Sequence, residues 1–179
     1  MPTAIYTPPN PGTVPQGLPA DHRILPNTVL RVPNTAGTQQ GKALTIALVP
    51  QASLSNQIDT ILNRPASDSP AQVVCLTIAG VPAPANQTAF LRVFINHPAP
   101  SLDTPVGDLH HVRDVAFFCC GSEGMQMSFY FEVTPNLRKL AANGESPARG
   151  FNLQLLAGAI RGEPGLIIPP LFQLAIAAL

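Results

Sequence analysis

Apolar and polar residues alternate along several short segments of the chain. This period of two predicts strands, because successive side chains of a strand point to opposite faces. The alternating segments are residues 44–48, 90–96, 127–133 and 151–155. Two further strands are predicted from short apolar runs at residues 73–78 and 115–119, the first of them β-branched and bounded by Pro70 and Gly80. Proline or glycine stands between most of them, as Pro50 and Gly80 do. We therefore expect short strands joined by turns and ordered loops.

Two segments have helical spacing instead. Thr134 is suited to the N-cap position, Pro135 to the first helical position and Gly144 to the end of a helix of two to three turns. A second short helix is predicted over residues 53–63, where apolar side chains recur at helical spacing. These side chains are Leu54, Ile58, Ile61 and Leu62.

Proline is concentrated at the N-terminus, where residues 1–27 hold seven of the 21 prolines. This composition predicts an extended, polyproline-like arm, followed by a single β domain over residues 28–179. The predicted fold is mostly β, a β-sandwich or a barrel-like domain with one or two short helices. The apolar stretch 166–179 is shorter than the roughly 20 residues that a membrane span needs. We expect it to be a core strand or a partner-facing tail.

Charge is scarce, at 11% of residues, and the formal net charge is zero. Average proteins carry about 25% charged residues. A charge-poor surface favours association with another protein, and the lack of a basic stripe argues against nucleic-acid binding. The N-terminal residues do not resemble a signal peptide. We expect a cytoplasmic protein with no membrane contact, and leave open its export together with a partner.

Soft metal ligands gather in one segment, where Cys119, Cys120, Met125 and Met127 lie within nine residues around two glycines. Thiolate and thioether groups suit Cu(I), so the segment is a candidate site for transient copper binding. The alternative is that these side chains pack in a core at the end of a hairpin. An odd number of cysteines, two of them adjacent, predicts reduced thiols rather than a disulfide framework.

Catalytic signatures are missing from the sequence, which has no nucleophile elbow, P-loop, GxGxxG or HExxH motif. The histidines are His22, His97, His110 and His111. They are too few for two copper ions with three histidines each, and we expect each to be a surface or loop residue. We predict that the chain is not an enzyme by itself and holds no intrinsic cofactor.

Four segments between residues 90 and 156 carry a family resemblance. They are FLRVFINHPAP, HHVRDVAFF, MSFYFEVTPNLRKLAANG and FNLQLL. Their order and spacing resemble the C-terminal β domain of tyrosinases and polyphenol oxidases, the type 3 copper family. The resemblance implies a noncatalytic domain or subunit that packs over the copper site of an oxidase, keeps it latent and helps to load copper. It also implies that an aromatic side chain enters the substrate pocket, for which Phe117, Phe118 and Tyr130 are candidates by location.

Two other functions are compatible with the sequence. One is a structural or self-assembling β module, in which copies of the chain exchange the proline-rich arm and the apolar tail. The other is a stand-alone Cu(I)-binding protein that uses the Cys/Met segment. The partner differs among the three hypotheses: a type 3 copper oxidase, a second copy of this chain, or the metal alone.

Overall fold

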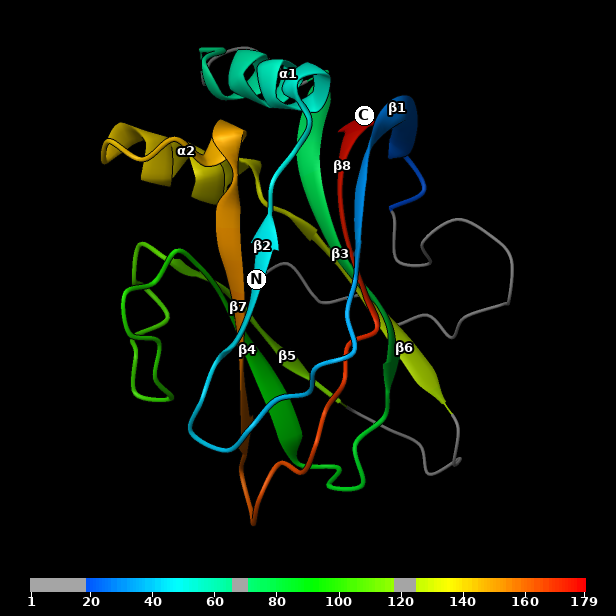
Figure 1. The fold of residues 1–179 in the computed structure, drawn as a ribbon, viewed down its shortest axis with the longest axis vertical. Helices are drawn as coiled ribbons and strands as arrows, with labels where there is room; N and C mark the ends of the chain where they lie inside the picture. Colours follow the sequence, from blue (N-terminus) through cyan, green and yellow to red (C-terminus); the bar gives the residue numbers. More distant parts are fainter. Residues whose placement is uncertain (1–18, 66–70, 118–124) are drawn as a thin grey trace.

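Two four-stranded antiparallel sheets form the fold, with strand orders β1-β8-β3-β6 and β2-β7-β4-β5 (Figure 1). The computed structural model describes residues 19–65, 71–117 and 125–179. The strands are β1 (Arg23–Pro33), β2 (Leu44–Leu48), β3 (Gln72–Pro82), β4 (Ala89–Ile95), β5 (His111–Ala116), β6 (Gln126–Glu132), β7 (Phe151–Ala159) and β8 (Leu171–Ala178). The helices are α1 (Ala52–Leu62), α2 (Thr134–Ala142) and the short 3₁₀ helix η1 (Pro147–Arg149). The mostly β prediction is confirmed, as a sandwich.

The core lies between the inner faces of the two sheets. Each central strand contributes alternate apolar side chains that are almost fully buried. They include Val74, Leu76 and Ile78 of β3, Phe172, Leu174 and Ile176 of β8, and Leu91, Val93 and Ile95 of β4. Full burial of such a side chain contributes roughly 1.5–3 kcal/mol. This alternation is the pattern that located most of the strands in the sequence.

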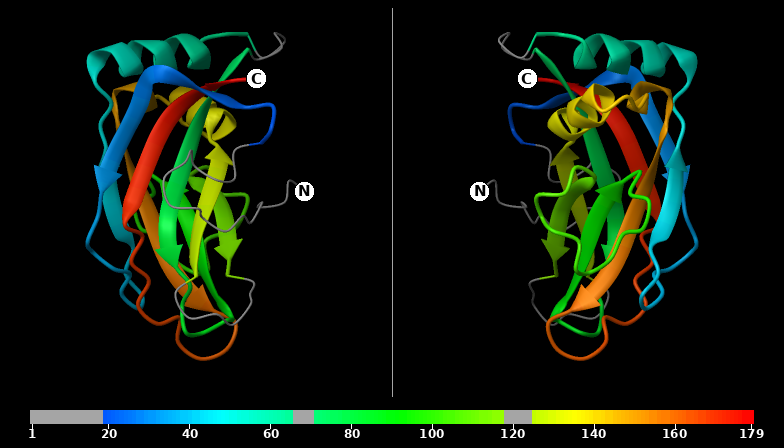
Figure 2. Two further views of the ribbon diagram at one scale, coloured as in Figure 1. Left: turned by 90° about the vertical axis from the view of Figure 1, so that its right-hand side faces the viewer. Right: turned by 90° about the vertical axis from the view of Figure 1, so that its left-hand side faces the viewer.

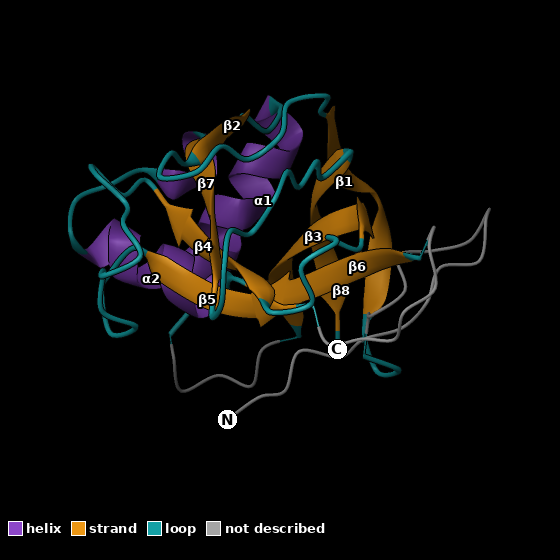
Figure 3. Ribbon diagram, turned by 90° about the horizontal axis from the view of Figure 1, so that it is seen from below, coloured by secondary structure: helices purple, strands orange, loops and turns teal. Residues whose placement is uncertain are grey.

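Both helices lie at the same end of the sandwich, as the two side views show (Figure 2). The view from below shows them behind the strands (Figure 3). They close the core with buried side chains, which are Leu54, Ile58 and Ile61 of α1, at the spacing that predicted this helix, and Leu137 and Leu140 of α2. Among the described residues, no helix has the length and apolarity required to cross a bilayer.

Thr134 does not have the N-cap role that its local sequence predicts. Val133 occupies the N-cap position, and the Thr134 hydroxyl accepts a hydrogen bond of 2.8 Å from the backbone N–H of Val74 in β3. A buried N–H group at the end of a strand needs an acceptor, and the hydroxyl supplies it. Tertiary context therefore redirects the side chain from its own helix to the neighbouring sheet.

Strand β1 is absent from the sequence prediction. It begins at Arg23, so the predicted boundary between arm and domain falls inside the strand. Its pairing with β8 shifts register between Ile24 and Val29, and Asn27 within this stretch has a positive φ of 59°. Pro26 lies in the same irregular stretch, where the lack of an N–H is tolerated. The irregularity hides the alternation that would have identified the strand.

Two further segments differ in extent from the prediction. The run predicted over 115–119 belongs to β5, which starts earlier, at His111, and residues 118 and 119 lie outside the described part. The C-terminal apolar stretch forms β8, which lies between β1 and β3 and is buried along most of its length. Of the two alternatives for this stretch, the core strand is confirmed.

We expect Thr134→Val to lower the free energy of unfolding by about 1–3 kcal/mol, because the buried N–H of Val74 loses its acceptor. Thr134→Ser keeps the hydroxyl and is the matched control, with a smaller loss. Urea unfolding of the three proteins measures the difference. Equal stability of the Val and Ser variants would show that the hydrogen bond contributes nothing.

Candidate functional site

The outward face of β4 is buried, although the strand already contributes its other face to the core. Arg92 is only 5% exposed and Phe94 is fully buried. Both are covered by the connection between β4 and β5, residues 96–110, which we call the β4–β5 loop. This loop lies in front of the sheet in the right-hand view of Figure 2. A loop layer on the sheet therefore replaces solvent on this face.

Arg92 fastens the middle of the loop. Its Nε donates to the Asp114 carboxylate at 2.9 Å, and its Nη1 donates to the carbonyl oxygens of Leu102 and Thr104, both at 2.7 Å. The guanidinium also lies 5.6 Å from the centre of the Phe94 ring. A buried charge has to be paired and hydrogen-bonded, and the planar fork of arginine holds several acceptors at once. The loop backbone thus supplies two of the hydrogen-bond acceptors of this buried guanidinium.

His111 fastens the far end of the loop to the same carboxylate. Its Nε2 lies 2.9 Å from Asp114 Oδ1, and its Nδ1 lies 3.1 Å from the carbonyl oxygen of Val106. The imidazole packs edge-on against Phe94, with ring centres 5.5 Å apart. Asp114 therefore joins two side chains that each hold a carbonyl of the loop.

Reciprocal hydrogen bonds fasten the near end of the loop to β7. Gln154 Nε2 donates to the His97 carbonyl at 2.9 Å, and the His97 backbone N–H donates to Gln154 Oε1 at 2.7 Å. His97 Nδ1 accepts from the backbone N–H of Ala99 at 3.0 Å, and its ring packs edge-on against Phe94. The loop is consequently tied down at its start, middle and end.

Two apolar side chains are presented to solvent by this loop. Leu102 is 46% exposed and Val106 is 71% exposed, with the exposed Asp103 between them in sequence. Their own carbonyl groups are the ones held by Arg92 and His111. We call Leu102, Asp103 and Val106 the loop surface. Their backbone positions are fixed before any partner arrives.

Gly158 of β7 makes room beneath Leu102. A Cβ at this position would lie 2.5 Å from Phe90 Cζ and 2.9 Å from Leu102 Cδ2. Side chains with a Cβ are thus excluded unless both neighbours move. Because Gly158 has no side chain, the Phe90 ring and Leu102 can pack close to the sheet. Glycine in a strand often marks such a close approach.

Three of the four histidines meet at this loop, which the sequence analysis did not anticipate. His97 and His110 have ring centres 5.5 Å apart, and side-chain exposures of 12% and 18%. His97 and His110 are loop residues, as expected, whereas the side chain of His111, the first residue of β5, is only 7% exposed. Among the described residues, no three histidine, cysteine, aspartate or glutamate side chains are arranged to hold a metal ion. The cluster fastens the loop.

Tyr130 lies on the outward face of the other sheet. Its hydroxyl is in close hydrogen-bonding contact with the thiol of Cys75, and the His22 ring packs edge-on against its ring at 5.9 Å. Burial raises the pKa of the free Cys75 thiol to about 12. Burial and the neighbouring Cys75 also raise the pKa of the Tyr130 hydroxyl. Both groups stay uncharged at neutral pH, and the hydroxyl is already engaged within the chain.

The remaining predicted site residues fall into two groups. Phe117 is 3% exposed and packs edge-on against Phe129, while Met127 is 2% exposed, so both side chains belong to the core. Met125 lies just before β6, where its carbonyl accepts from the Ala83 N–H at 3.0 Å. Phe118, Cys119 and Cys120 lie outside the described residues. Copper binding by the Cys/Met segment stays a prediction.

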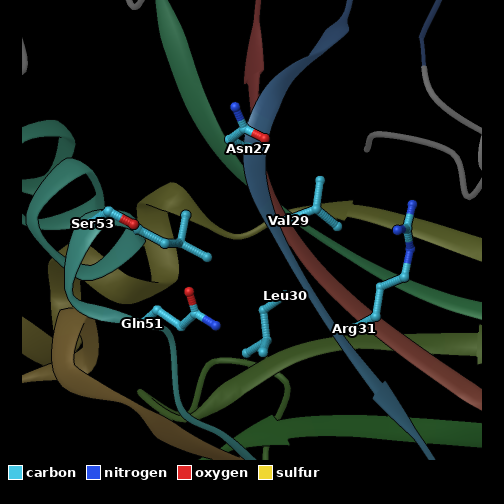
Figure 4. Close-up of a pocket in the computed structure, with 7 residues that line it drawn as sticks. Asn27, Val29, Leu30, Arg31, Gln51 and Ser53 are labelled. Carbon is cyan, nitrogen blue, oxygen red and sulfur yellow. The ribbon is translucent and has the colours of Figure 1, made fainter.

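A cavity of about 220 Å³ lies between β1 and the start of α1 (Figure 4). Its lining has no carboxylate, imidazole or thiol and consists of Asn27, Val29, Leu30, Arg31, Gln51, Ser53 and Leu54. Pockets for small molecules usually measure about 300–1,000 Å³. The cavity has room for one side chain and shows no group placed for catalysis.

We expect Arg92→Met to release the β4–β5 loop and to lower the free energy of unfolding by about 3 kcal/mol. This is the low end for breaking a buried ion pair, because Asp114 is partly exposed. Hydrogen exchange should accelerate at the amides of Ser101 and Thr104. The exposed Arg161→Met is the control. Unchanged protection of these amides would rule out the fastening role.

We expect stability to fall as pH rises above about 9, the ordinary pKa of a cysteine thiol. Between pH 9 and 12 Cys75 keeps its proton in the folded state and loses it in the unfolded state. Rising pH therefore stabilises the unfolded state relative to the folded state. This group contributes a slope of up to about 1.4 kcal/mol per pH unit. Urea unfolding of the parent and of Cys75→Ala measures it. Identical slopes would contradict the assignment.

No family model matches the chain, and no curated protein matches it by sequence. Among solved structures, it is similar to a latent aurone synthase, a polyphenol oxidase. The recombinantly expressed form has 13% identity and a TM-score of 0.51 over 79% of this chain and 26% of that chain. The form from natural source has 13% identity and a TM-score of 0.52 over 81% of this chain and 26% of that one. The chain thus spans about a quarter of these structures and shares the fold of that part.

Proposed function

We propose that this chain is a noncatalytic accessory domain or subunit that packs on a type 3 copper oxidase and keeps it latent. The observation that carries the proposal is the fold. About four-fifths of this chain superposes on only about a quarter of a latent polyphenol oxidase. A part of that size accounts for one domain of the larger protein.

The chemistry of the chain supports a binding role. The histidines near the β4–β5 loop are engaged with backbone groups or with the Asp114 carboxylate. The motif resemblance implies that oxidation requires six histidines on two coppers, more than the four in this sequence. The oxidising centre of the proposed complex therefore belongs to the partner.

Latency has a simple physical basis in this proposal. A domain that covers the mouth of an active site excludes substrate as long as the closed arrangement is populated. Stable interfaces bury about 800 Å² on each partner. A charge-poor surface, with 11% charged residues in the chain, loses little hydration when it is covered.

The test is co-expression with each six-histidine copper oxidase encoded in the same genome. We expect one of them to copurify with this chain and to oxidise a phenol at least about tenfold more slowly than alone, the effect of a 1.4 kcal/mol preference for the closed state. An unrelated β-sandwich domain of similar size is the control. Failure to copurify, or full activity in the complex, would refute the proposal.

A further inference from the structure

We infer that the loop surface, formed by Leu102, Asp103 and Val106, is where this chain docks on its partner, and this inference rests on the proposed function. The matching partner surface is apolar, to cover Leu102 and Val106, and carries a lysine or arginine side chain opposite Asp103. Three properties of the loop support this: its prior order, the use of a buried charge to hold it, and its own charge.

The loop surface is ordered before binding. Arg92 holds the carbonyl of Leu102 at 2.7 Å, and His111 lies 3.1 Å from the carbonyl of Val106. Ordering a flexible loop at an interface has an entropic cost that lowers the affinity. Because the intramolecular contacts already order this backbone, two exposed apolar side chains become available for docking with little of that cost remaining.

A buried arginine is not required to stabilise a sheet of this kind. Apolar residues of similar volume often replace a buried ion pair with no loss of stability. Arg92 nevertheless occupies an internal strand, and its side chain is 6% exposed. Arg92 fixes the position of the loop, because two of its hydrogen bonds go to the loop carbonyls of Leu102 and Thr104. We infer that the charge serves to hold the loop in one conformation.

The charge of the loop selects the partner. Residues 96–110 include Asp103 and Asp108 but no lysine or arginine. Asp108 accepts the His110 N–H at 2.8 Å, whereas Asp103 is exposed and has no partner among the described residues. Two copies of this surface would bring like charges together, which is unfavourable. A basic and apolar surface on a different protein is the complementary one.

The test uses the parent complex with the six-histidine oxidase and two loop variants, Val106→Asp and Asp103→Lys. We expect each to raise the dissociation constant by about tenfold or more, since a desolvated charge or a repulsive charge pair disfavours the bound state. Leu166→Asp and Asp59→Lys are matched controls, because both positions are exposed and lie away from the loop. Thermal unfolding confirms that all four variants are folded.

The outcomes separate the two proposals. If the parent binds and inhibits the oxidase while both loop variants bind equally well, the docking surface is wrong and the proposed function stands. If the parent binds no oxidase, both are wrong. If the parent forms dimers that Val106→Asp disrupts, the occupant is a second copy of this chain and the inferred partner is wrong. Weaker binding by both loop variants but neither control supports the inference.

Discussion

The burial of β4 on both faces is the constraint on which the rest of this structure depends. Leu91, Val93 and Ile95 face the other sheet, so Arg92 and Phe94 must face away from it. Covering the Phe94 ring gains apolar burial, but the same cover buries the Arg92 guanidinium, which then needs hydrogen-bond acceptors. The β4–β5 loop covers both groups, and two of its carbonyl oxygens accept hydrogen bonds from the guanidinium. The conformation of that loop is therefore imposed by the strand beneath it.

The local sequence pattern was sufficient to identify the strands and helices where the core is regular. The alternation in β4, β6 and β7, the apolar run in β3 and the helical spacing around Ile58 identified elements that the structure contains. It failed where tertiary contacts override local preference. Pro26 and Asn27 interrupt β1, whose pairing with β8 joins segments at opposite ends of the sequence. Thr134 is a residue type suited to capping a helix. Its hydroxyl instead accepts a hydrogen bond from the backbone N–H of Val74, a strand residue distant in sequence.

The candidate site was harder to foresee, because its contacts are not periodic. His97 and His111 stand at the two ends of one connection, and both rings pack against the Phe94 ring. The alternation of β4 did place Arg92 beside Phe94, but nothing in the pattern showed that a loop would cover them. Leu102 and Val106 lie in a proline-containing loop with no periodic pattern. The sequence does not show that Arg92 and His111 contact their backbone carbonyls, because these contacts depend on the folded path of the loop. The motif resemblance indicated the fold but gave no information on this loop.

The pairing of β1 with β8 has a consequence for attachment. Arg23 is in register with Ala178, so the first and last strands of the sandwich are adjacent and begin and end at one corner, near α1 (Figure 1). Adjacent strands are separated by about 5 Å. A tether leaving either strand at this corner would start from nearly the same point. Fusion before β1 or after β8 would therefore give this domain a common pivot and a similar reach, and the domain would turn about that point as one body, carrying the fastened β4–β5 loop with it.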